Sequence, residues 1–85
     1  MPNIIVYCTH TCPYCNMAER LLNGKHVEFT KIRVDLYPEL RAEMIQRSGR
    51  CTVPQIFIGN THVGGFDDLS AMDKRGELDL LLKHA

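Results

Sequence analysis

The sequence contains no tryptophan and no surplus of charge of either sign. Its ten basic and ten acidic side chains balance, so it lacks the excess of Lys and Arg that binds nucleic acids or anionic membranes. It also lacks an apolar run close to the roughly 20 residues that span a bilayer. We therefore expect neither nucleic acid nor membrane among its partners.

Internal repeats, linkers and low-complexity segments are also missing. An 85-residue chain without them predicts a single domain over residues 1–85, long enough to enclose one hydrophobic core. No charged-then-apolar leader precedes the first apolar run, so no secretory signal is expected. Four cysteines without a leader indicate catalytic thiols in a reducing compartment, and hence a cytoplasmic protein, rather than a disulfide scaffold.

The most specific motif is Cys12-Pro13-Tyr14-Cys15, which follows a short apolar run and precedes a helical pattern. This order of strand, Cys-x-x-Cys and helix is typical of a redox-active dithiol. Proline suits the first helical position, so Cys12 would be the N-cap. The free N–H groups and the helix dipole would then favour the thiolate of Cys12 over its thiol. We expect Cys12 to be the nucleophile and Cys15 to attack a mixed disulfide formed on it.

A structural disulfide or half of a zinc site is the alternative interpretation of this motif. One Cys-x-x-Cys does not complete a tetrahedral site, and the chain has no second close pair of cysteines, so no metal site is predicted. Cys8, at the end of a strand, is expected to be a small buried hydrophobe. Cys51 is interpreted as an ordinary partly buried cysteine, with a regulatory or metal-assisting thiol as the alternative.

Hydrophobic periodicity in the first part of the chain predicts a strand, a helix and a second strand. We expect a buried strand over residues 3–8 and a helix over 13–23 that ends with Gly24 in the left-handed conformation. The second strand, 27–34, changes phase, so a bulge or loosening is expected near Thr30-Lys31. Together these elements predict a right-handed, parallel βαβ unit.

The rest of the chain predicts a helix, a hairpin and a third helix, which completes the order βαβαββα. The second helix is expected to open at Pro38 and to end at Ser48-Gly49. Two short apolar runs flank Gly59-Asn60, which is a strong signal for a two-residue hairpin turn. Asp67 is expected to cap the third helix, and Gly76 to break it before a last short helical segment.

Three motifs in order resemble the glutaredoxin family, of the short bacterial type that carries Cys-Pro-Tyr-Cys. They are Cys12-Pro13-Tyr14-Cys15, Thr52-Val53-Pro54 and Gly64-Gly65-Phe66-Asp67-Asp68, and the resemblance covers nearly the whole chain. It implies an α/β, thioredoxin-like fold, in which helices flank a four-stranded mixed sheet of order 2-1-3-4. It also implies a cis peptide bond before Pro54.

The resemblance further implies a glutathione-dependent thiol–disulfide oxidoreductase. Such an enzyme binds no cofactor tightly and uses glutathione as its co-substrate. Its expected partners are glutathione and glutathionylated proteins, with ribonucleotide reductase as a candidate substrate, and it is expected to be a monomer. The catalytic pair would be Cys12 and Cys15.

The glutathione-binding residues implied by the resemblance come from four short segments. They are Thr9, Tyr14, Thr52, Val53, Pro54, Gly65, Phe66, Asp67 and Asp68. The main chain of Val53 can pair with an extended peptide as a short added strand. N–H groups at the start of the third helix can hold a carboxylate. The side chains of Asp67 and Asp68 can take an ammonium, and the γ-glutamyl end of glutathione carries both groups.

Thr9 departs from the family pattern, because glutaredoxins usually carry a lysine three positions before the nucleophile. Without that fixed cation, we hypothesise that the thiolate of Cys12 is less stabilised than in lysine-bearing relatives. His10 can substitute only while it is protonated, near or below pH ~6.5. Alternatively, His10 is simply solvated and the helix N–H groups suffice.

Two other functions are compatible with parts of the sequence. The first is a thioredoxin-like reductant that does not use glutathione. The absence of the pattern Trp-Cys-Gly-Pro-Cys argues against this function. The second is an iron–sulfur or zinc carrier, because some glutaredoxins bridge a cluster between two subunits with glutathione as co-ligand. Pro13 argues against this function, since a proline in the dithiol motif generally disfavours cluster binding in the family.

Overall fold

Four strands and four helices follow one another along residues 3–84, the part of the chain that the computed structural model describes. In chain order they are β1 (Ile4–Cys8), α1 (Pro13–Gly24), β2 (Thr30–Arg33), α2 (Pro38–Ser48), β3 (Gln55–Ile58), β4 (Thr61–Gly64), α3 (Phe66–Lys74) and α4 (Glu77–His84). This confirms the predicted order, and α4 is the expected last helical segment. Within residues 3–84, no helix combines the length and apolar character that crossing a membrane requires.

The strands form one mixed sheet of order β2-β1-β3-β4, which confirms the predicted topology. β1 runs parallel to β2 and antiparallel to β3, and the two-residue turn Gly59-Asn60 joins β3 to β4 as an antiparallel hairpin. The end of β1 therefore lies beside the start of β3, where Tyr7 pairs with Gln55. This pairing brings the loop that leads to Cys12 next to the segment that precedes β3.

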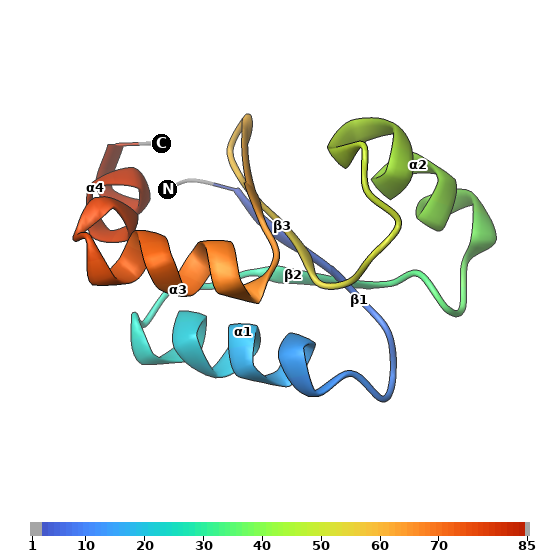
Figure 1. The fold of residues 1–85 in the computed structure, drawn as a ribbon, viewed down its shortest axis with the longest axis horizontal. Helices are drawn as coiled ribbons and strands as arrows, with labels where there is room; N and C mark the ends of the chain where they lie inside the picture. The colour runs from blue at the N-terminus through green and yellow to red at the C-terminus, as the bar shows by residue number, and fades with distance from the viewer. Residues whose placement is uncertain (1–2, 85) are drawn as a thin grey trace.

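Helices cover both faces of the sheet, with α1 and α3 on one side and α2 on the other (Figure 1). Side chains alternate between the two faces along a strand, and β1 follows that rule. Val6 and Cys8 lie in the core cluster shared with α1, α3 and α4, whereas Tyr7 lies in the smaller cluster shared with α2. The fully apolar β1 is thus explained by burial on both faces.

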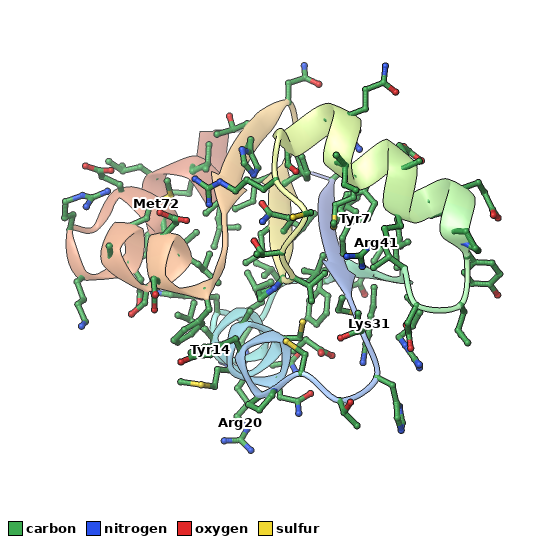
Figure 2. The ribbon with its side chains drawn as sticks, turned by 45° about the vertical axis from the view of Figure 1, so that its right-hand side comes forward. Tyr7, Tyr14, Arg20, Lys31, Arg41 and Met72 are labelled. Atoms are coloured by element: carbon green, nitrogen blue, oxygen red, sulfur yellow. The ribbon has the colours of Figure 1, made fainter. Side chains whose placement is uncertain are left out.

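α2 is attached to the sheet through one buried tyrosine and its surroundings. The Tyr7 hydroxyl accepts a hydrogen bond from Arg47 at 2.9 Å and donates one to Glu43 at 3.4 Å. The Arg47 guanidinium also lies 4.3 Å from the ring centroid of Phe57, and Met44 is buried beneath the helix. Figure 2 shows Tyr7 between β1 and α2. These contacts fix the helix whose end leads into the segment 49–54.

Two predictions about the first helix and second strand are wrong. α1 includes Gly24 and its C-cap is Lys25 in a right-handed conformation, while His26 carries the positive φ of 59°. The N–H of Lys25 bonds to carbonyls of the preceding turn, so the chain reverses two residues later than Gly24. β2 is also shorter than residues 27–34, because it begins only at Thr30.

The change of phase in this region has a packing origin. Val27 and Phe29 pack against the larger core cluster, whereas Ile32 packs against the cluster under α2. Phe29 and Ile32 are an odd number of positions apart, so ordinary alternation of side chains places them on opposite faces of the sheet. Among the recorded strand pairs, the register shift lies between Ile56 and Phe57 in the hairpin and not at Thr30-Lys31.

Candidate active site

Cys12 is the N-cap of α1, as the motif predicts. Its backbone is extended, with φ −129° and ψ 105°, and Pro13 occupies the first helical turn. The Cys12 sulfur accepts a hydrogen bond from the Cys15 N–H at 3.3 Å. As a thiol it also points to the Val53 carbonyl oxygen, 3.8 Å away. The half-buried sulfur therefore lies where the start of α1 meets the segment before β3.

The other cysteines differ sharply from Cys12 in their surroundings. Burial, followed by the hydrogen bond with Cys12, raises the pKa of the Cys15 thiol to about 12. Burial likewise raises the pKa of Cys8 to about 11, which agrees with its predicted place in the core. Cys51 is exposed, so its prediction as a partly buried cysteine is wrong. Both buried thiols therefore stay protonated near neutral pH, whereas Cys12 is only half-buried at the start of α1.

A cleft of about 230 Å³ lies between the start of α3 and the segment before β3. Its lining is Tyr14, Arg50, Thr52, Val53, Pro54, Gln55, Gly65, Phe66, Asp67 and Asp68. The fold thus brings together eight of the nine residues expected to bind glutathione, while Thr9 lies outside the lining. The Val53–Pro54 peptide bond is cis, as expected. Tyr14 projects from α1 (Figure 2), and its ring centroid is 6.5 Å from that of Phe66.

The start of α3 differs from the prediction in its capping residue. The helix begins at Phe66, its N-cap is Gly65, and Asp68 rather than Asp67 reaches back to the chain before it. The Asp68 carboxylate accepts the Gly65 N–H at 3.0 Å. That bond, and then the ion pair with Arg50, lower the pKa of Asp68. Asp67 is left exposed at the cleft, one residue closer to the helix start than the acid that caps it.

Gln55 and Arg50 line the cleft but were not predicted as site residues. Gln55 is fully buried, and its amide nitrogen donates to the Thr52 carbonyl at 3.0 Å and to the Thr52 hydroxyl at 3.2 Å. Its amide oxygen lies 2.8 Å from His62 Nε2. Gln55 thereby holds Thr52 in place beside Val53. The available signal was a glutamine in a buried apolar strand, because such a side chain must find hydrogen-bond partners.

The loop before Cys12 is tied to the end of β2 rather than to the cleft. The His10 N–H donates to Asp35 at 3.3 Å, and Arg33 binds the same carboxylate through two nitrogens at 2.8 and 2.6 Å. The Arg33 guanidinium lowers the pKa of Asp35 to about 2. The imidazole of His10 is exposed, while Thr9 is half-buried. The carboxylate of Asp35, which is paired with Arg33, thus holds the backbone of this loop. The side chain at position 9 carries no charge.

Introducing a lysine at position 9 tests whether the missing cation matters. In Thr9→Lys, an ammonium near the sulfur should lower the midpoint of the thiolate absorbance titration by about one pH unit, because an opposite charge within a few ångströms favours the ionised form. Thr9→Gln is the matched control, since it has similar length and no charge. An equal midpoint in wild type and Thr9→Lys would show that the α1 N-terminus alone sets the thiolate population.

Metal coordination was the alternative role for the cysteines. Within residues 3–84, no group of three or more His, Cys, Asp and Glu side chains is placed to hold a metal ion. In this structure Cys12 and Cys15 face each other through a hydrogen bond between sulfur and backbone.

Comparison with known proteins places these features in a family. Residues 4–63 match the family described as Glutaredoxin. Glutaredoxin 3 of Escherichia coli is 54% identical over 83 residues, which cover 98% of this chain and all of that protein. The solution structure of glutaredoxin from Brucella melitensis superposes with a TM-score of 0.86 at 55% identity, covering 98% of this chain and 90% of the other. A buckwheat glutaredoxin–glutathione complex gives a TM-score of 0.89 at 27% identity, covering 96% and 77% of the two chains.

Proposed function

The chain belongs to the glutaredoxin family, and from that premise we propose that it is a glutathione-dependent thiol–disulfide oxidoreductase. Family and fold support thiol–disulfide exchange as the reaction class. The observation that carries the finer proposal is the position of the Cys12 sulfur, 3.8 Å from the Val53 carbonyl at a cleft that also holds the start of α3. One disulfide-bonded peptide can reach both features at once.

The first step is attack of the Cys12 thiolate on a glutathionylated substrate. A bond forms between the Cys12 sulfur and the glutathionyl sulfur, while the bond to the substrate sulfur breaks. The substrate leaves as a thiolate and takes a proton from solvent. The Cys15 N–H, which donates to the Cys12 sulfur at 3.3 Å, supports the nucleophile as an anion before attack.

The second step regenerates the Cys12 thiolate. The thiolate of a second glutathione attacks the glutathionyl sulfur of the mixed disulfide, so glutathione disulfide leaves and Cys12 is released. The two steps together convert the glutathionylated substrate and one free glutathione into the substrate thiol and glutathione disulfide. With a protein disulfide as substrate, Cys15 instead attacks the mixed disulfide on Cys12, gives the Cys12–Cys15 disulfide and releases the reduced protein.

Bound glutathione is proposed to lie along the cleft with its sulfur at Cys12. Its cysteinyl main chain pairs with Val53 as a short added strand. Its γ-glutamyl carboxylate lies at the free N–H groups of the α3 start, and its ammonium faces Asp67 and Asp68. The buckwheat relative supports glutathione as the ligand, because it shares the fold and its structure is a glutathione complex. Thr9 is proposed to contribute from the edge of the site rather than from the cleft lining.

Glutathione dependence is tested by comparing two mixed disulfides in a steady-state assay. One carries glutathione and the other carries cysteinylglycine, which lacks the γ-glutamyl group. We expect kcat/KM to be at least about tenfold higher for the glutathione disulfide, because charge-assisted hydrogen bonds contribute about 1.5–3 kcal/mol each. Equal values would contradict the glutathione proposal while leaving a general disulfide reductase.

A cluster carrier is the competing function. The anaerobically purified protein is expected to show no visible absorbance from an iron–sulfur cluster, and a cluster band would favour the carrier instead.

We propose glutathionylated proteins as substrates, with ribonucleotide reductase as a candidate disulfide substrate, and the reducing cytoplasm as the compartment in which a catalytic thiolate persists.

A further inference from the structure

Arg50 reaches across the cleft to the start of α3. Its guanidinium Nη1 lies 3.1 Å from Asp68 Oδ2, and both residues belong to the cleft lining. The two residues are 18 positions apart, one on the segment before β3 and the other in the first turn of α3. This contact bridges the end of the cleft where the γ-glutamyl group of glutathione is proposed to bind.

The main chain of Arg50 is held by Ser48, whereas its guanidinium is held only by an exposed ion pair with Asp68. The Ser48 hydroxyl accepts the Arg50 N–H at 3.0 Å and donates to the Met44 carbonyl at 2.7 Å. Gly49 caps α2 in the left-handed conformation, with φ 71°. The guanidinium itself is about half exposed, with 49% of the Arg50 side chain and 47% of the Asp68 side chain accessible. Arg50 therefore starts from a fixed backbone position and ends in a half-exposed charged group.

The guanidinium of Arg50 occupies the position beside Asp68 where the ammonium of a bound ligand would lie. Asp68 also accepts the Gly65 N–H, so its carboxylate is already engaged twice before any ligand arrives. An exposed ion pair is weak, so an incoming ammonium can take the place of Arg50 with little loss of free energy. The guanidinium that is released remains beside the cleft and needs a new anion.

Arg50 is the only basic side chain among the ten residues that line the cleft in the described chain. The charges of Arg50 and Asp68 both act on the imidazole of His62. Burial and the charge of Arg50 lower the pKa of this imidazole, so it is neutral at pH 7. Asp67 and Asp68 supply negative charge on the α3 side. The cleft lining therefore presents one half-exposed cation and two carboxylates to a zwitterionic ligand.

We propose that Arg50 is a specificity residue that leaves Asp68 when glutathione binds and pairs with the α-carboxylate of its γ-glutamyl group. The ammonium of the same group takes the place of the guanidinium at Asp68. Arginine suits this exchange because its planar fork binds a carboxylate through two N–H groups. This inference rests on the proposed glutathione site and adds to it a side chain that reads the carboxylate.

The test compares two disulfide substrates with wild type, Arg50→Gln and Arg50→Lys. One substrate is the glutathione mixed disulfide, and the other is the same disulfide with the γ-glutamyl α-carboxylate converted to a carboxamide. Arg75→Gln is the matched control, because Arg75 forms an equally exposed pair with Glu77 at 3.0 Å and is not part of the cleft lining.

We expect wild type to prefer the carboxylate substrate in KM, and Arg50→Gln to reduce that preference about fivefold or more, as the loss of one charge-assisted contact predicts. Arg50→Lys should retain part of the preference. The kcat of both Arg50 variants should be unchanged, and Arg75→Gln should keep the wild-type preference. An unaltered preference in Arg50→Gln, or a KM that falls equally for both substrates, would overturn the proposal, since Arg50 would then only compete for Asp68. Failure of the glutathione proposal itself would appear separately, as a wild type that does not distinguish glutathione from cysteinylglycine.

Discussion

Replacing Cys12 with serine is expected to reduce glutathione-dependent disulfide reduction to the uncatalysed background, whereas Cys15→Ser keeps the reduction of glutathione mixed disulfides. Cys12 is the half-buried N-cap thiol, and its sulfur lies 3.8 Å from the carbonyl oxygen of Val53, which lines the cleft. Cys15 is 1% exposed and its pKa is raised to about 12, so it stays a thiol until Cys12 has reacted. Steady-state turnover of a glutathione mixed disulfide measures both effects.

Cys12→Ser and Cys15→Ser also separate the route that uses Cys12 alone from the route that uses both cysteines. Cys15→Ser should lose the reduction of protein disulfides, because it cannot resolve a mixed disulfide by forming the Cys12–Cys15 bond. Cys51→Ser is the control, since Cys51 is an exposed cysteine outside the cleft lining and should leave both activities intact. Robust turnover by Cys12→Ser would show that the nucleophile has been assigned to the wrong residue.

Gly64→Ala is expected to produce the largest loss outside the cysteines. Gly64 has a φ of 116°, which side-chain-bearing residues rarely adopt, and an added Cβ would collide with the carboxylate of Asp68. Asp68 would have to move and would lose its bonds to the Gly65 N–H and to Arg50. We expect the free energy of unfolding to fall by about 1–3 kcal/mol from backbone strain, and KM for the glutathione disulfide to rise as well. Denaturant titration and steady-state kinetics measure the two effects.

Gly76→Ala separates strain from the effect at the site. Gly76 also has a positive φ, 76°, but an added Cβ there would meet nothing within 4 Å. It lies between α3 and α4, outside the cleft lining, so this variant should lose stability without a change in KM. If both variants raised KM equally, the effect of Gly64 would be one of general stability rather than of the Asp68 position.

Contacts made by α2 also help to fix the position of the segment that lines the cleft before β3. α2 carries the Arg47 contact with Tyr7 and ends at the Gly49 cap, directly before Arg50. The segment that continues to Val53 is held further by Gln55, which is itself fixed by His62. The position of the Val53 carbonyl beside Cys12 therefore depends on contacts from α2, β3 and β4 together.

The sequence by itself determined the local features of this protein. The cap at Cys12 follows from a proline in the first helical turn, and the hairpin follows from Gly59-Asn60 between two apolar runs. Each of these depends on residues a few positions apart, so local backbone preferences are enough to specify it. The prediction of Cys12 and Cys15 as the catalytic pair rests on the same kind of local signal, which is their spacing and helix context.

Tertiary structure decided the contacts between segments that are distant in the chain. The Arg50–Asp68 pair, the contact of Gln55 with His62 across the hairpin and the exposure of Cys51 depend on which segments meet at the sheet edge. The choice of Asp68 over Asp67 as the acid that bonds Gly65 depends on where α3 begins, and that start is set when the chain leaves β4. No period or motif in the sequence encodes these meetings. They follow from the pairing of β1 with β3, which brings the Cys12 loop and the segment before β3 together.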